Sequence, residues 1–174
     1  AFSVGAWRTA LRHFEAALPV EDAPRSPGGA VIYAMCGFWT LNCTFYLGDL
    51  KGLAVRRDRY LELVRAAGDR MSEGRIGVSM QAFAALAADD PQTAAQELTL
   101  TLQRWPRGGF VTERSHAFLA ERAIDLYSGD GARAWARCAD RWPVYARSYL
   151  YQGQYGRVFG EFWRGGCALL AASE

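Results

Sequence analysis

The sequence predicts an all-α fold, a right-handed superhelix of antiparallel helix pairs with about eight helices in a single domain. Apolar residues recur at three- and four-residue steps, and no run alternates with period two, so no strand is expected. The turn residues Gly5, Gly48, Asp89 and Gly129 recur at intervals of roughly 40 residues, which indicates stacked supersecondary units. With 51% hydrophobic and 22% charged residues, the chain has enough apolar surface to bury a core.

The first two expected helices differ in character. Residues 7–18 carry Trp7, Leu11 and Phe14 on one helical face, and Pro19 is expected to end this helix. Residues 30–47 lie in a stretch without charge that is long enough to span a bilayer. Small and polar residues interrupt that stretch, so we interpret it as a helix packed on several sides rather than a membrane span. The interrupting residues are Gly37, Thr40, Asn42 and Thr44.

Turn chemistry separates the helices that follow. Gly48–Asp49 and Gly129–Asp130 each combine a residue that tolerates the left-handed conformation with a carboxylate that can cap the next helix. At Asp90–Pro91 the aspartate takes the cap and the proline the first helical position. Pro106 and Pro143 are expected to end the helices before them. The remaining expected helices cover 50–67, 78–86, 92–105, 111–127, 132–142 and a last helix at 150–172.

These turns divide the chain into repeat units, and the first unit would lack its leading helix, as in a fragment of a longer protein. The expected units are 1–27, 28–70, 71–108 and 109–146, followed by the last helix.

Two resemblances follow from these residues. Gly5, Trp7, Ala10, Phe14 and Ala17 stand in the order found in the second helix of a tetratricopeptide repeat, which the first segment therefore resembles. That resemblance implies a tetratricopeptide-like α-solenoid, with the later units as longer, degenerate members of the same helix-turn-helix class.

The second resemblance covers roughly the last 100 residues. The Tyr-x-Gly-Asp turns at 46–49 and 127–130, the segment Asp140–Pro143 and the segment Ser148–Leu150 resemble the helical repeat region C-terminal to bacterial serine/threonine protein kinase domains. It implies that the parent protein is such a kinase and that this chain is its sensing or docking part. No glycine-rich nucleotide loop, His-Arg-Asp or Asp-Phe-Gly sequence is present, and the only lysine, Lys51, follows no phosphate loop. No kinase site residue is therefore expected here.

Other reactive residues receive structural interpretations. The four cysteines, Cys36, Cys43, Cys138 and Cys167, are expected to be small buried residues in a reducing cytoplasm rather than metal ligands. His13 and His116 lack partners at metal-ligand spacing. Glu121 and Asp125 lie four apart beside Arg122, and we expect a solvated charged face rather than a catalytic pair. The formal net charge of +2 favours neither nucleic acid nor an anionic membrane as a partner.

One set of residues suggests a binding groove. In a helical-repeat superhelix, the first helices of successive units line the concave face. Transferring the tetratricopeptide inner positions to these units predicts an apolar groove with a few polar side chains, suited to a peptide. The alternative is that these side chains only pack against their neighbours. The predicted groove residues are Phe38, Asn42, Ser79, Phe83, His116 and Leu119.

The sequence thus predicts a non-enzymatic protein-interaction or regulatory module of a cytoplasmic bacterial signalling protein. We expect a protein or peptide partner, no cofactor, no metal and no nucleic acid, and exposed ends could also pair two copies. The alternatives are a non-catalytic fragment of another enzyme or of an ATP-dependent transcriptional regulator, and a domain that binds a small-molecule effector.

Overall fold

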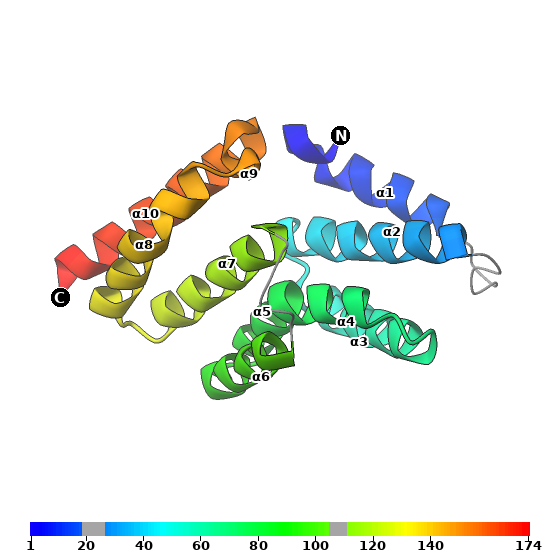
Figure 1. Cartoon of the computed structure of the whole chain (residues 1–174), viewed down its shortest axis with the longest axis horizontal. Helices are drawn as coiled ribbons and strands as arrows, with labels where there is room; N and C mark the ends of the chain where they lie inside the picture. Colours follow the sequence, from blue (N-terminus) through cyan, green and yellow to red (C-terminus); the bar gives the residue numbers. More distant parts are fainter. Residues whose placement is uncertain (19–26, 105–110) are drawn as a thin grey trace. The chain divides into compact units, whose positions relative to one another are not determined.

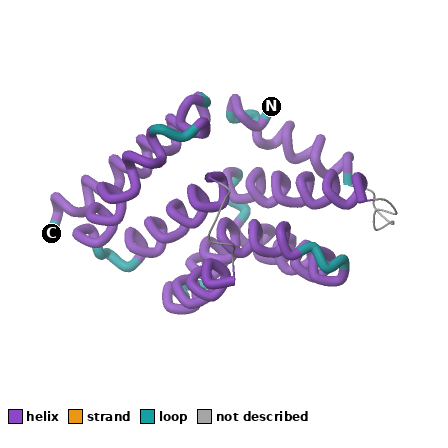
Figure 2. The backbone as a smooth tube through the Cα atoms, viewed as in Figure 1, coloured by secondary structure: helices purple, strands orange, loops and turns teal. Residues whose placement is uncertain are grey.

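The computed structural model describes residues 1–18, 27–104 and 111–174, and the chain divides into two compact units, Ala1–Ile76 and Gly77–Glu174. Every regular element in these ranges is helical, as Figure 2 shows. The all-α prediction is therefore confirmed for the described residues. The finer division into repeat units and their superhelical stacking stay predictions.

The first unit is built around one apolar helix. The 3₁₀ turn η1 (Phe2–Val4) and helix α1 (Trp7–Ala17) are followed by α2 (Pro27–Tyr46), α3 (Leu50–Ala66) and α4 (Arg70–Ile76). Helix α1 lies along α2 (Figure 1), where the Trp7 ring stacks on Tyr46 with centroids 5.0 Å apart. On another side of α2, Gly37 leaves room for Tyr60 of α3, whose ring would lie 2.9 Å from an added Cβ. The interior of α2 thus packs on several sides, as its composition predicts.

The second unit begins with the π-helical turn η2 (Gly77–Gln81), which passes directly into α5 (Ala82–Ala87). It continues with α6 (Pro91–Arg104), α7 (Val111–Tyr127), α8 (Gly131–Ala146), the short α9 (Tyr149–Gln152) and α10 (Gln154–Ser173). Small residues let η2, α5, α6 and α7 approach closely around a buried cluster that includes Ala94 and Ala120. A second buried cluster joins α7, α8 and α10.

The predicted turns form as their residues dictate. Gly48 has φ 76° and the Asp49 carboxylate accepts from the Gly52 N–H at 2.8 Å. Gly129 has φ 71° and Asp130 accepts from the Arg133 N–H at 2.9 Å. Helix α6 begins at Pro91, with Asp90 capping the Thr93 N–H at 2.9 Å. These junctions are confirmed.

Another glycine-aspartate junction was not among the predicted turns. Gly68 has φ 67°, and the Asp69 carboxylate accepts from the Ser72 N–H at 3.0 Å, so α3 ends and α4 begins there. The predicted boundary at residue 70 is close to this junction, but the capping chemistry is that of Gly48–Asp49.

Two predictions about where helices begin and end are wrong. Pro143 lies inside α8, which continues to Ala146. The last helix is not one element, because Gly153 separates α9 from α10. Tyr145 explains the first: it is buried, and its hydroxyl donates to the Gly156 carbonyl at 2.7 Å, which fixes the residues after Pro143 against the start of α10. The predicted ends at Pro19 and Pro106 lie outside the described residues.

The uncharged stretch folds as α2, in which two buried polar side chains donate to backbone carbonyls of the same helix. Asn42 donates to the Phe38 carbonyl, and Thr44 to the Thr40 carbonyl, each at 2.8 Å. Across the described ranges, no helix has both the length and the apolar character needed to cross a membrane.

Candidate functional site

The six predicted groove residues are divided between the two units. Phe38 and Asn42 belong to the first unit, where both are buried in α2. Ser79 is buried in the second unit, whereas Phe83, His116 and Leu119 are half-buried. Phe83 packs against the cluster shared by α5, α6 and α7. The continuous groove stays a prediction. Among the six residues, those with partly exposed side chains are Phe83 of α5 and His116 and Leu119 of α7.

A cleft of about 580 Å³ opens instead beside α7, between side chains of α6 and α8. This volume falls in the range of roughly 300–1,000 Å³ that ligand sites occupy. The base of the cleft contains the buried Phe118 and Tyr145 rings, while Val144 at its rim is 71% exposed. The residues that line it are Leu102, Arg114, Ser115, Ala117, Phe118, Asp140, Arg141, Val144 and Tyr145.

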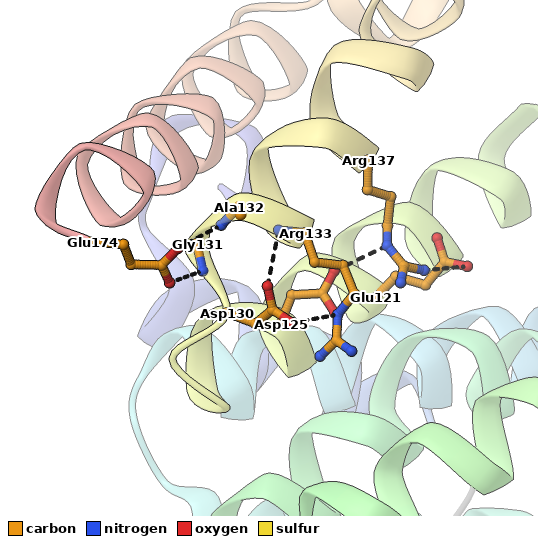
Figure 3. Close-up of polar contacts among 8 residues, drawn as sticks. All are labelled: Glu121, Asp125, Asp130, Gly131, Ala132, Arg133, Arg137 and Glu174. Atoms are coloured by element: carbon orange, nitrogen blue, oxygen red, sulfur yellow. Dashed lines mark hydrogen bonds and ion pairs between the residues drawn. The ribbon is translucent and has the colours of Figure 1, made fainter.

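A ladder of ion pairs sets the position of α8 against α7 (Figure 3). The Asp125 carboxylate on α7 accepts from Arg133 Nε at 2.8 Å and pairs with Arg137 Nε at 2.9 Å. One turn away, Glu121 pairs with Arg137 at 3.2 Å and with Arg141 at 2.5 Å. Arg141 therefore lines the cleft with its guanidinium group already fixed by a carboxylate of α7.

This ladder corrects the expected solvated charged face. The Asp125 side chain is only 3% exposed, and Glu121 is largely buried as well. Sequence reasoning missed this because the partners come from the next helix, eight to twenty residues away, and not from the same helical face. The arginine contacts give both carboxylates a structural role, which is to hold α8 against α7.

Arg122 differs from its two acidic neighbours in direction and burial. It is 1% exposed, its Nε donates to the Phe118 carbonyl at 3.4 Å, and its guanidinium carbon lies 4.1 Å from the centroid of the Phe118 ring. Burial is the main influence on this group and lowers the pKa of Arg122. The Phe118 ring thus separates a buried cation from the cleft that the same ring lines.

The cleft residues were largely missed in the sequence. On α7 the prediction chose His116 and Leu119, whereas Ser115 and Phe118 line the cleft, one position earlier in each case. On α8 the prediction ended the helix at Pro143, so Val144 and Tyr145 were excluded from any helical face. Phe118 and Tyr145 occupy apolar positions of the helical pattern, and this pattern is the sequence signal that could have identified them as cleft residues.

The described residues contain no group of three or more histidine, cysteine, aspartate or glutamate side chains arranged to hold a metal ion. A smaller cleft of about 170 Å³ lies along the ion-pair ladder and is lined by Glu121, Asp125, Arg133 and Arg137 among others. Because its charges neutralise one another, the larger cleft is the better candidate for a ligand.

No family model, no curated protein and no solved structure matches this chain.

Proposed function

We propose that this chain is a non-enzymatic protein-interaction module whose second unit binds a short peptide segment of a partner protein in the α6–α7–α8 cleft. The observation that carries the proposal is the apolar base of that cleft together with the exposed Val144 side chain at its rim. An exposed apolar rim beside a concave apolar surface is typical of a site that buries one anchor side chain of a peptide.

The charges around the cleft favour a peptide with an acidic residue beside its apolar anchor. Arg114 and Arg141 line the cleft against the single carboxylate of Asp140. Guanidinium groups bind carboxylates through paired hydrogen bonds, and Arg141 is held in place by Glu121. A leucine or phenylalanine anchor with a neighbouring aspartate or glutamate therefore fits the cleft.

The test is a selection of random peptides on the purified protein, followed by affinity measurement on two variants. Val144→Asp places a charge at the cleft rim, and Val55→Asp places the same charge on α3, where Val55 is 67% exposed. We expect selected peptides to share an apolar-acidic pair and to lose at least about tenfold in affinity, one hot-spot contact, with Val144→Asp only. Peptides that are insensitive to Val144→Asp, or no enrichment at all, would overturn the proposal.

The resemblance to the region that follows bacterial serine/threonine kinase domains supports placing the module in a larger signalling protein. The nucleotide sequence upstream of the codon for Ala1 tests this separately. A glycine-rich nucleotide loop with its lysine would support a kinase parent, and a different catalytic domain would support the alternative enzyme fragment.

A further inference from the structure

We propose that Cys138 and Cys167 form a redox-active dithiol in the second unit, beside the buried Arg122, and that a peroxide oxidises the pair to a disulfide between α8 and α10. This site is separate from the peptide cleft and does not depend on the proposed function.

The packing of α8 against α10 brings the two cysteines together. Both belong to one buried cluster with Phe118 and Ala134, with Cys138 1% and Cys167 0% exposed. An added Cβ at Gly131 of α8 would lie 2.6 Å from the Ala171 nitrogen of α10. An added Cβ at Gly160 of α10 would lie 2.6 Å from the Tyr145 ring of α8.

These two glycine contacts lie on either side of the cysteines along both helices, which therefore run antiparallel. The close approach of helix backbones is the condition for a disulfide, which requires Cα atoms roughly 4.4–6.8 Å apart. Cys138 and Cys167 stand between these two contacts and share one buried cluster.

The charge of Arg122 gives the pair its asymmetry. An arginine side chain stays protonated in proteins, and a buried cation requires a compensating anion. Glu121 and Asp125, the acidic residues nearest to it on α7, bind arginines of α8 instead. The Nη1 atom of Arg122 is buried without a hydrogen-bond partner, and the charge of Arg122 lowers the pKa of the Cys138 thiol. A Cys138 thiolate supplies the missing anion.

The other groups around Cys138 also lower the pKa of its thiol. The hydrogen bond from the Cys167 thiol lowers the pKa of Cys138 most, and the charge and hydrogen bond of Arg122 together with the charge of Arg164 bring it to about 6 despite burial. The same pairing raises the pKa of Cys167, which stays protonated. Cys43 is equally buried without such a cation, and burial, with a smaller contribution from the charge of Glu15, raises its pKa to about 11.

The reaction follows from this asymmetry. The Cys138 thiolate attacks one oxygen of hydrogen peroxide, the O–O bond breaks, and Cys138 becomes a sulfenic acid while hydroxide leaves. Cys167 then attacks the Cys138 sulfur, and its proton leaves with the sulfenic oxygen as water. In total, one thiolate, one thiol and one hydrogen peroxide give a disulfide, one water and one hydroxide. Burial favours this small oxidant over bulky disulfides and keeps water away from the sulfenic acid.

The experiment treats the folded chain with hydrogen peroxide at a series of pH values, blocks the remaining thiols and digests with trypsin. Arginines separate the two sites, so the disulfide joins the peptide Cys138–Arg141 to the peptide Gly165–Glu174 in a mass spectrum. We expect this linkage to form in preference to any involving Cys43, at a rate that levels off above about pH 6–7. Failure of the linkage to form in the folded chain, or a rate that still rises steeply between pH 8 and pH 9, would overturn the proposal.

Variants separate the roles. Cys167→Ser should stop oxidation at a Cys138 sulfenic acid that a diketone reagent traps, and Cys138→Ser should abolish both products. Arg122→Met should slow the oxidation at pH 7 at least tenfold, whereas Arg137→Met, which removes an arginine of the ion-pair ladder, should change it less than twofold. An Arg122→Met rate equal to wild type contradicts the proposal. If Arg122→Met does not fold, the pH profile of the wild-type chain decides.

Discussion

Gly131→Ala tests the contact between α8 and α10 on which the second unit depends. An added Cβ would lie 2.6 Å from both the Ala171 nitrogen and the Leu170 carbonyl carbon, and 2.9 Å from the Ala171 Cα. All three are backbone atoms, so no side-chain rotation relieves the clash and the helices must separate. The same residue donates its N–H to the Glu174 carboxylate at 2.5 Å, as Figure 3 shows.

The expected cost follows from two opposing effects. Overpacking of this kind destabilises by about 1–3 kcal/mol. Replacing a helical glycine with alanine stabilises by at most about 1 kcal/mol. We therefore expect Gly131→Ala to lower the free energy of unfolding by about 1–2 kcal/mol, or a few degrees in melting temperature for a chain of this length.

Gly165→Ala is the matched control. Gly165 lies within α10, and an added Cβ there meets no atom within 4 Å. Only the helix-propensity gain applies, so the variant should be more stable than wild type by up to about 1 kcal/mol. Urea denaturation followed by circular dichroism measures both. If Gly131→Ala is as stable as Gly165→Ala, then α8 and α10 do not meet at this level and the reasoning is refuted.

Three further predictions concern the same unit. Pro143→Ala should raise the melting temperature, because an internal proline costs a helix up to about 3 kcal/mol; a decrease would contradict its position within α8. Asp125→Asn should cost about 1–3 kcal/mol in a urea melt by removing the charge that two arginines share, whereas Asp58→Asn on the exposed surface should cost less than about 0.5 kcal/mol. Because the pKa of Cys138 is lowered from 9.0 to about 6, wild-type stability should rise between about pH 6 and pH 9, whereas below pH 6 both states carry the protonated thiol and Cys138 adds no further pH dependence. Above pH 9 the raised pKa of Cys167 opposes any further gain, and Cys138→Ser should remove the rise.

The local sequence determines most of the helix positions. A glycine with positive φ followed by a capping aspartate acts through atoms three residues apart, so the turns at Gly48 and Gly129 were predictable. Pro143 was misjudged because its tendency to end a helix is local, whereas the contact of Tyr145 with Gly156 that keeps α8 helical is a tertiary contact.

The sites were less predictable for the same reason. Glu121, Arg122 and Asp125 are consecutive or nearly so, yet the structure sends the carboxylates to α8 and the guanidinium group into the core beneath Phe118. Cys138 and Cys167 lie almost thirty residues apart with no motif between them, and only the packing of α8 on α10 pairs them. Helical periodicity predicts which residues are apolar but not which neighbouring helix each side chain meets.

The central claim is that the α6–α7–α8 cleft receives the partner peptide, and methyl NMR of valine-labelled protein tests it most directly. Four exposed valines act as reporters at different elements: Val4 on η1, Val55 on α3, Val144 at the cleft and Val158 on α10. On titration with a selected apolar-acidic peptide, we predict that the Val144 methyl signals shift in proportion to binding while those of the other three stay in place. Shifts at Val55 or Val158 with an unchanged Val144 signal would contradict the claim.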